Sequence, residues 1–515
     1  MEKTVMNLKG SMTVFAALSM LLVASFLFAL LEAARVQGLD ACADMVSEVG
    51  VTSICAEYQQ PIWEDYRLLF LDGAYGTEKF SEEKMDSVLC QRISENLDVS
   101  KIGGISMYGL SLQSAEVSEY RLASDGDGAV FLKCVASYMK SHLTKELAEE
   151  LYQKYKEETD VENSDRSEYS VEGADKAIEE AKKAQEETAS DTEEAQSPEA
   201  GETFDETSSA EPEETEKPEE PKENPLDIVL KLKENAILGM VVGNVSALSA
   251  KQVDLQNCML KRELQKGTKT ASAEVGWYER VLVAEYLEHY FSNYRNPKLD
   301  GAFSYELEYL LCGEDTDKSN LEGVINRLLL MREAANITAI IKDATKRNEA
   351  KAIAEILAGF TGNPAIILVV QCGIIAAWAY VESVLDLRAL VRGDKIALVK
   401  SDAQWTCNTK SLADSLGNDA KAKNCENGLT YEEYLKMFLF TMGTKKLAYR
   451  MMDVIEQSVK TKQGYEHVRM DYMVCEMSCS IQYQADTLFA DLSLIRKGAS
   501  KGFCFEKMKF FSYIE

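Results

Sequence analysis

Cysteine and histidine are the residue types through which this chain could bind a metal or act as a nucleophile, and their spacing favours neither chemistry. A structural zinc site takes about four Cys or His ligands. Cys475 and Cys479 form a pair spaced by four positions, but no second pair supplies the remaining ligands. The three histidines, His142, His289 and His467, stand neither in an HExxH pattern nor beside a cysteine pair. We therefore predict no metal site and no cofactor.

The even number of cysteines, twelve, permits disulfide bonds if the protein lies outside the cytoplasm. Cys407 and Cys425 flank a polar loop that contains Lys and Asn, and they form our candidate disulfide. Two reduced cysteines are the equal alternative, because twelve cysteines in 515 residues are few enough to be small buried apolar side chains.

Catalytic motifs are missing from the sequence, which contains no Walker A, GxGxxG or GxSxG pattern. Asp125 and Asp127 lie in a DGDG stretch that lacks the other oxygen ligands of a calcium loop, so a plain turn is favoured. The formal net charge is −29, whereas a phosphate-binding surface needs clustered Lys and Arg. We therefore predict that the protein is not an enzyme and binds no nucleic acid.

The elements that position these residues begin with an apolar N-terminal segment. Residues 11–31 contain no charge, and as a helix with ~1.5 Å rise per residue they span roughly 31 Å, the thickness of a bilayer core. Lys3 and Lys9 precede this transmembrane segment, while Asp40 follows it. Basic flanks stay in the cytoplasm, so we predict a single-pass protein of the cytoplasmic membrane, with 1–10 as a cytoplasmic leader and the C-terminal body outside.

The helix is predicted to continue past the membrane to about residue 49. Glu32 and Arg35, one helical turn apart, are predicted to pair at the membrane interface. Beyond them the apolar residues keep helical spacing, at Val36, Leu39, Ala43, Val46 and Val49. A membrane helix that continues onto an outer domain is the general plan of pilin-like subunits.

Gly10 and Ser11 mark a candidate leader cleavage site, because substrates of prepilin peptidase carry Gly before the apolar run and are cut after it. The fifth residue after such a cut is usually Glu in pilins, and here it is Phe15. An uncleaved anchor is the alternative. Mass spectrometry of the mature N-terminus distinguishes the two, since a chain that starts at Met1 excludes cleavage.

The rest of the chain divides into three regions by composition. Residues 50–156 are predicted to form an outer α/β region. Residues 157–223 carry 26 acidic and 6 basic side chains, and five of the eight prolines lie between 157 and 225, which predicts a disordered acidic linker at 157–225. Residues 226–515 are predicted to form a mainly helical domain with a small antiparallel sheet, where 467–484 alternates as two strands or one bulged strand. The expected fold class is therefore α+β and mostly helical.

A second apolar run at 365–381 is long enough to be considered as another membrane span. It is short for that purpose, contains Gln371, and continues with helical periodicity into Glu382 and Asp386. We therefore favour a buried helix at the centre of the helical domain. Protease protection in spheroplasts would reveal a span, because residues 386–515 would then return to the cytoplasm.

Several segments of the chain together carry a family resemblance. They are residues 10–18 (GSMTVFAAL), 31–35 (LEAAR) and 58–75 (YQQPIWEDYRLLFLDGAY). Further along they are 306–310, 320–336 (NLEGVINRLLLMREAAN), 378–386 (WAYVESVLD) and 431–453 (YEEYLKMFLFTMGTKKLAYRMMD). These segments resemble an uncharacterised Gram-positive family of membrane-anchored proteins associated with tight-adherence (Tad) pilus loci, and the N-terminus is also similar in plan to TadE/TadG-like pseudopilins. The resemblance implies a setting, not a mechanism.

Two functions from different classes follow. The first is a non-catalytic structural or assembly component of a Tad-type pilus or secretion system, with the membrane and other subunits of the apparatus as partners. The second is a cell-envelope carbohydrate-binding protein or wall-active enzyme in contact with the cell wall. The second function predicts a cleft with convergent carboxylates and aromatic side chains, such as Trp277, Trp378 or Trp405. Core packing is the alternative role for these tryptophans.

Overall fold

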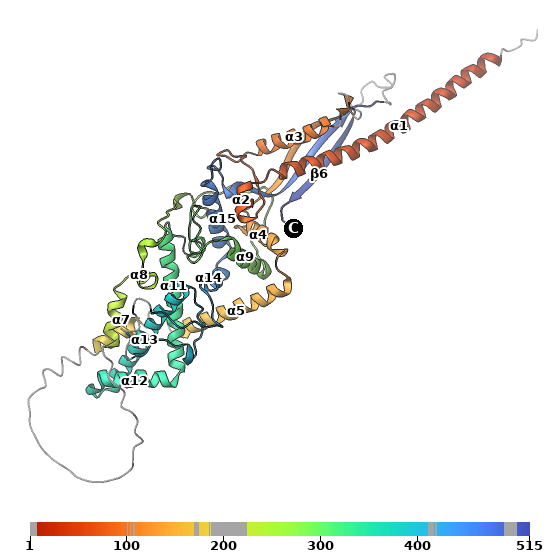
Figure 1. Ribbon diagram of the computed structural model, residues 1–515. Helices are drawn as coiled ribbons and strands as arrows, with labels where there is room; N and C mark the ends of the chain where they lie inside the picture. Colours follow the sequence, from red (N-terminus) through yellow and green to blue (C-terminus); the bar gives the residue numbers. More distant parts are fainter. Residues whose placement is uncertain are drawn as a thin grey trace, which may run out of the picture. The chain divides into compact units, whose positions relative to one another are not determined.

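The computed structural model describes residues 8–99, 101–102, 105–106, 109–168, 175–184, 186, 224–409, 412, 417, 420–488 and 502–514. The chain divides into two compact units, each described by itself below. Unit 1 comprises Met1–Tyr138, Glu263–Val275 and Val459–Glu515, and unit 2 comprises Met139–Arg262 and Gly276–Ser458. Helices predominate and the sheets are small and antiparallel (Figure 1), so the predicted fold class is confirmed.

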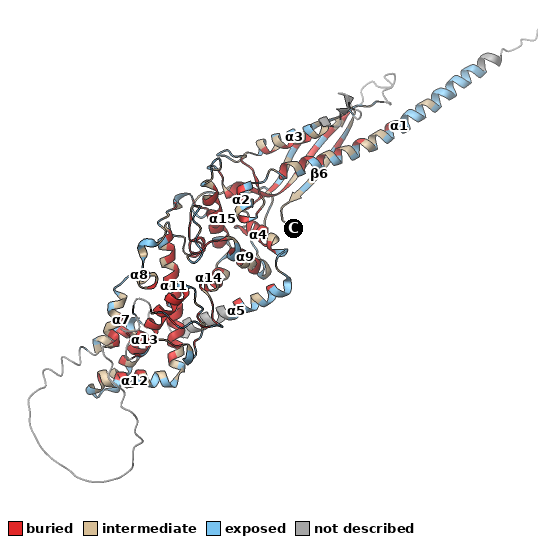
Figure 2. Ribbon diagram, viewed as in Figure 1, coloured by how far each residue is buried: buried red, intermediate tan, exposed pale blue. Residues whose placement is uncertain are grey.

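Helix α1 (Leu8–Cys55) runs without interruption past the predicted end near residue 49. Figure 2 shows most residues of the first part of α1 as exposed. Between residues 12 and 31 they include many large apolar residues. The second part of the helix buries one side, which includes Leu39 and Val51. Val49, which the predicted apolar stripe included, is 48% exposed, because the inward positions near the end of the helix pass to Val51 and its neighbours.

Four strands form the main sheet of unit 1: β1 (Leu71–Asp72), β4 (Leu110–Leu122), β5 (Met473–Ala485) and β6 (Phe503–Ser512). Strand β5 is central and antiparallel to the other three. The alternating segment at 467–484 thus yields one strand, and the register shifts lie in the pairing with β4 at three places. A separate antiparallel pair is formed by β2 (Lys101–Ile102) and β3 (Ile105–Ser106).

Helices α1 and α3 (Glu82–Val99) pack on one face of the main sheet. Strand β5 places Cys479, Ile481 and Tyr483 in the resulting core, while the residues between them point to the other face. This alternation is the period of two that a half-covered strand requires. The other helices of unit 1 in the described chain are α2 (Gln60–Tyr66) and α4 (Ala129–Lys140).

Unit 2 is a helical body. Its described helices are α5 (Lys145–Glu168), α7 (Pro225–Lys233), α8 (Ile237–Val242), α9 (Trp277–Tyr290), α10 (Glu306–Cys312), α11 (Asp317–Lys342), α12 (Ala344–Ala358), α13 (Pro364–Arg392), α14 (Tyr431–Phe440) and α15 (Thr444–Lys460), which ends in unit 1. Short 3-10 turns connect several of them, among them η4 (Asp402–Gln404).

Helix α13 occupies the centre of unit 2 and contains the second apolar run. The Asn363 side chain accepts a hydrogen bond from the N–H of Ala365, and Gly393 ends the helix with a φ of 98°. From Val370 onward most of its side chains are buried, with α11, α12, α7 and α8 as neighbours. Among the described helices, α1 and α13 are long and apolar enough to cross a membrane; 56% of the most apolar window of α13 is buried, and none of that of α1.

The predicted region boundaries differ from the structure in two places. Helix α5 continues into the segment predicted as a linker at 157–225, residues 175–184 are helical, and 187–223 lie outside the described residues. The end of the predicted domain 226–515 belongs to unit 1, because β5 pairs with β4 from the region predicted at 50–156. Pairing between strands this far apart in sequence leaves no local signal.

Candidate functional site

Glu32 and Arg35 form an ion pair, with Arg35 Nη1 3.1 Å from Glu32 Oε1, although Glu32 is only 4% exposed. The same two side chains fasten α1 to the segment that follows β5. Arg35 donates to the carbonyl of Asp486 at 2.9 Å, and Glu32 accepts from the N–H of Leu488 at 3.3 Å. Burial of these charges is offset because each has partners. Their position at a membrane interface stays a prediction.

The next two turns of α1 carry acidic side chains that pair with lysines of β6, and we call this group the α1–β6 ion cluster. Lys507 Nζ lies 2.9 Å from Asp40, and Lys509 Nζ lies 3.0 Å from Asp44 and 2.9 Å from Glu48. The hydrogen bond from Lys509 lowers the pKa of Asp44. The cluster fixes the second part of α1 against the edge strand of the sheet.

The candidate cleavage site lies at the start of the same helix. Gly10 and Ser11 belong to the first turns of α1. Phe15, which stands where pilins carry Glu, has a side chain that is 73% exposed. Cleavage between Gly10 and Ser11 stays a prediction.

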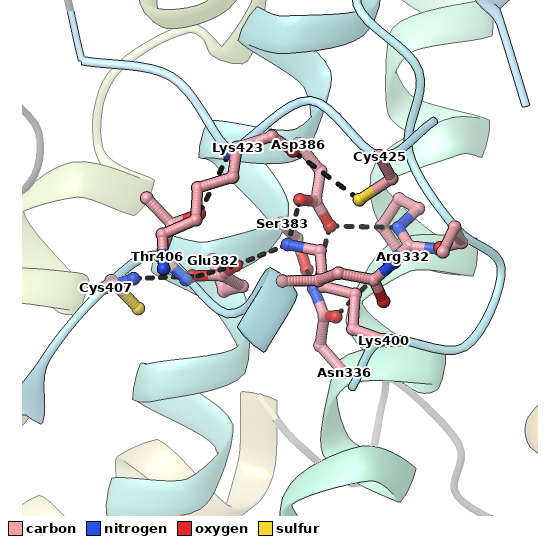
Figure 3. A network of polar contacts seen from close by, with 12 residues as sticks. Arg332, Asn336, Glu382, Ser383, Asp386, Lys400, Thr406, Cys407, Lys423 and Cys425 are labelled. Carbon is pink, nitrogen blue, oxygen red and sulfur yellow. Dashed lines mark hydrogen bonds and ion pairs between the residues drawn. The ribbon is translucent and has the colours of Figure 1, made fainter. Parts of the chain in front are cut away.

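The candidate disulfide between Cys407 and Cys425 is not formed: both are free thiols, and Figure 3 shows them on opposite sides of the residues drawn. Cys407 Sγ contacts the carbonyl of Trp378 at 3.9 Å, and Cys425 Sγ contacts that of Lys423 at 3.6 Å.

Burial raises the pKa of the Cys479 thiol to about 12, which keeps it protonated and unreactive. The described residues hold no group of three or more His, Cys, Asp or Glu that could bind a metal ion.

Four charged side chains meet in the interior of unit 2, and we call them the buried ion network: Arg332, Glu382, Asp386 and Lys400. Figure 3 shows Lys400 between Glu382 and Asp386 of α13, and it forms ion pairs with both. Arg332 of α11 donates from Nε to Asp386 Oδ2 at 3.0 Å, and Asn336 donates to the same oxygen at 3.1 Å. Two cations balance two anions, as a site without water contact requires.

The buried ion network also holds the segment 395–409 against α13. Arg332 donates to the carbonyls of Ala397 and Leu398, each at 2.9 Å. Glu382 accepts from the backbone N–H groups of Thr406 at 3.1 Å and Cys407 at 2.8 Å. These bonds determine where the side chains of the segment lie, including that of Trp405.

An open pocket of about 570 Å³ lies where this segment meets the start of α12, and we call it the acidic pocket. Among the described residues, three carboxylates line it, those of Asp343, Glu349 and Asp402, together with one cationic side chain, that of Lys346. Their formal charges sum to −2. Trp378 and Trp405 also line the pocket and contact each other edge to face, with ring centroids 5.7 Å apart.

Lys346 crosses this pocket and is held by three groups. Its ammonium donates to Asp343 Oδ2 at 2.6 Å, forms an ion pair with Asp402, and lies 5.1 Å from the centre of the Trp405 ring. The hydrogen bond from Lys346 lowers the pKa of Asp343. Asp343 also caps α12, because its carboxylate accepts from the N–H groups of Thr345 and Lys346.

The structure brings together two of the three tryptophans named as candidates for a cleft. Trp378 and Trp405 line the acidic pocket but are 2% and 7% exposed, so they also pack in the core. Trp277 instead packs on Tyr152, with ring centroids 5.2 Å apart. The carboxylates of the pocket were missed because Asp and Glu are abundant in this chain and those of the pocket come from separate segments.

These observations define a mostly helical α+β chain whose apolar N-terminal helix is suited to serve as a membrane anchor or a signal sequence. The chain belongs to a family of unknown function, DUF5702, whose model matches residues 215–485, more than half of the chain. The match includes the buried ion network and the acidic pocket. No curated protein and no solved structure matches the chain. The link to Tad pilus loci therefore stays a hypothesis.

Proposed function

We propose that the protein is a membrane-anchored extracytoplasmic structural component of a Tad-type pilus or secretion apparatus, pilin-like in plan and without a catalytic role. One observation carries the proposal. Helix α1 exposes apolar side chains along its first part, and its second part packs on an antiparallel sheet. Because the helix is continuous, the segment that we propose for the membrane leads directly into the part of α1 that packs on the sheet.

The first part of α1 is suited to lipid rather than water. Burial of apolar surface is worth about 25 cal/mol per Å², so an exposed run of this size requires a membrane or a protein partner. Two of its serines satisfy their hydroxyl groups within the helix: Ser19 donates to the carbonyl of Phe15 at 2.5 Å, and Ser25 to that of Leu22 at 2.8 Å. Lipid imposes this requirement, because it offers no hydrogen bonds.

Charged residues return where α1 begins to pack on the sheet of unit 1. Glu32 and Arg35 are the first charged residues after the apolar run, and the α1–β6 ion cluster follows. Lys3 and Lys9 precede the run, so the rule that basic flanks stay inside supports a cytoplasmic N-terminus and an outer body. The apolar part of α1 is then the surface through which the protein contacts other membrane subunits.

The test replaces residues 11–31 of the full chain by an equally long sequence of Leu and Ala, which preserves anchoring and removes the native side chains. We expect the variant to remain in membranes but to lose the apparatus subunits that co-purify with the native protein from detergent-solubilised membranes. Surface pili, counted by electron microscopy, should also be lost. Glu355→Gln, an exposed change on α12, is the control and should preserve both.

Two results would contradict the proposal. A strain that lacks the protein and still assembles normal pili and adheres normally would exclude the pilus role. Unchanged co-purification and piliation with the Leu/Ala segment would show that α1 is an anchor without a role in assembly.

A further inference from the structure

The acidic pocket of unit 2 has an excess of negative charge that its own lysine does not balance. Among the described residues, Asp343, Glu349 and Asp402 line the pocket together with one ammonium group, that of Lys346. Lys346 pairs with Asp343 and Asp402 but not with Glu349, which accepts from the hydroxyl of Thr409. Asp402 is the most accessible of the three, with a side chain that is 73% exposed. A pocket with a net charge of one sign raises the local concentration of ions of the opposite sign. The pocket therefore favours a cationic ligand over an anionic one.

The arrangement fits an organic cation rather than a metal ion. A metal needs several oxygen ligands within about 2.0–2.6 Å of one point, and no group of three His, Cys, Asp or Glu among the described residues meets this condition. Lys346 shows how an ammonium group is held here, by carboxylates on its rim and by the face of Trp405. A ligand ammonium would take the same partners.

The remaining lining groups suit a ligand that also carries hydroxyl groups. Thr345 and Asn408 lie in the lining and are exposed. Trp405 lines the pocket, is 7% exposed, and its buried indole N–H donates to no described side chain or carbonyl. A volume of about 570 Å³ lies in the range of small-molecule sites. A sugar ring offers hydroxyl groups for the exposed Thr345 and Asn408 and one apolar face for an aromatic ring.

We propose that the acidic pocket binds an amino sugar through its free ammonium group, in competition with the side chain of Lys346. The ammonium displaces that of Lys346 from Asp402 and Asp343, and the hydroxyl groups contact the rim. The ligand chemistry is a non-acetylated 2-amino sugar, either free or as a residue of an envelope polymer. This binding goes beyond the structural function proposed above and does not depend on it.

The test titrates the detergent-solubilised full chain with D-glucosamine by calorimetry at about pH 6.5, where the amine is protonated. N-acetyl-D-glucosamine and D-glucose are the neutral controls, and 2-aminoethanol is the amine without a sugar ring. A chemically de-N-acetylated glycan, compared with free D-glucosamine, distinguishes a polymer-bound source from a free one. We expect D-glucosamine to bind at least about tenfold more tightly than the neutral sugars and 2-aminoethanol, because it alone offers both the charge and the hydroxyls.

Variants test whether D-glucosamine binds in the acidic pocket. Asp402→Asn removes an exposed charge, folds without strain, and should lower the affinity for D-glucosamine about tenfold. Lys346→Met removes the competing ammonium and should raise this affinity by a similar factor. Trp405→Phe should lower the affinity. Glu355→Gln, which removes a half-exposed charge on the same helix α12 outside the pocket, is the matched control and should leave the affinity unchanged.

Each of the other outcomes overturns the proposal. Equal affinity for N-acetyl-D-glucosamine excludes recognition of the ammonium, and equal affinity for 2-aminoethanol excludes recognition of the sugar. An unchanged affinity in Asp402→Asn and Trp405→Phe places the binding elsewhere, and no heat with any amine excludes the site. The proposed structural function is tested separately, by piliation and co-purification, so its failure cannot be mistaken for failure of this site.

Discussion

Helices α1 and α13 are both strongly apolar, but unit 2 buries much of α13, whereas the first part of α1 is exposed. Each is long and apolar enough to cross a membrane. None of the most apolar window of α1 is buried, whereas 56% of that of α13 lies inside unit 2. Length and hydropathy therefore do not separate a membrane helix from a core helix. The distinction lies in the partners of the charged residues that follow each apolar run.

The acidic residues of α13 and those of the α1–β6 ion cluster have opposite environments. Glu382 and Asp386 of α13 are fully buried and reach Lys400 and Arg332 inside unit 2. The acidic residues of the α1–β6 ion cluster remain largely exposed to solvent. Helix α13 could enter lipid only if its carboxylates gave up their cations, whereas α1 can enter lipid without breaking any of its ion pairs.

Removal of residues 1–31 gives the largest expected effect and tests the comparison directly. We expect the shortened chain to leave the membrane fraction almost entirely, because α13 is satisfied within unit 2 and provides no second anchor. The measurement is carbonate extraction of membranes followed by immunoblotting, with the full chain as the control. A shortened chain that stays in the extracted membrane would mean that α13 spans the bilayer.

Substitution of Asp386 by Asn is the next largest effect. It keeps the side-chain volume but leaves Arg332 and Lys400 opposite only one carboxylate, that of Glu382. An uncompensated buried charge costs about 3–5 kcal/mol of unfolding free energy. Urea unfolding measures the loss.

The matched control is Lys351→Met, which breaks a surface ion pair of α12 at 3.5 Å and should change the stability by at most about 0.5 kcal/mol. If Asp386→Asn proves as mild as this control, the buried ion network does not stabilise α13 in the interior, and the contrast with α1 fails.

Glu308 of α10 is a second kind of buried carboxylate, which can be compared with Glu382 and Asp386. Among the described residues it accepts only from neutral donors, the N–H of Tyr294 at 2.9 Å and the hydroxyl of Tyr431 at 2.7 Å. Burial raises its pKa from 4.5 to about 7. Folding therefore favours the protonated form, and this contribution to stability, complete below about pH 4.5, is lost as the pH rises through 7.

Glu308→Gln removes this titration. We expect the variant to match the native protein at pH 5 and to exceed its unfolding free energy at pH 8, by on the order of 1–3 kcal/mol. Urea unfolding at the two pH values measures the difference. A difference independent of pH would mean that Glu308 is ionised in the folded protein over the whole range.

The sequence predicted those elements whose signals are local. The apolar run and the pairing of Glu32 with Arg35 follow from spacing along one helix, and the burial of α13 follows from charges that continue its periodicity. Strand β6 was missed because Lys507 and Lys509 stand on its helix-facing side, where the pattern of a strand calls for apolar residues. The acidic pocket was missed because loop and helix residues far apart in sequence form it.

Lys509→Met has the smallest expected effect and tests the exposed ion pairs between α1 and β6. Its ammonium pairs with Asp44 and Glu48, whose side chains are more than half exposed, so solvent screens both pairs. We expect a fall of about 2 °C in the melting temperature at low salt. At 1 M salt, where the Debye length is about 3 Å, the difference from the native protein should vanish. The effect of Asp386→Asn should persist at the same salt concentration, because its partners are buried. A loss in Lys509→Met that resists salt would show that α1 is held to β6 by more than screened charges.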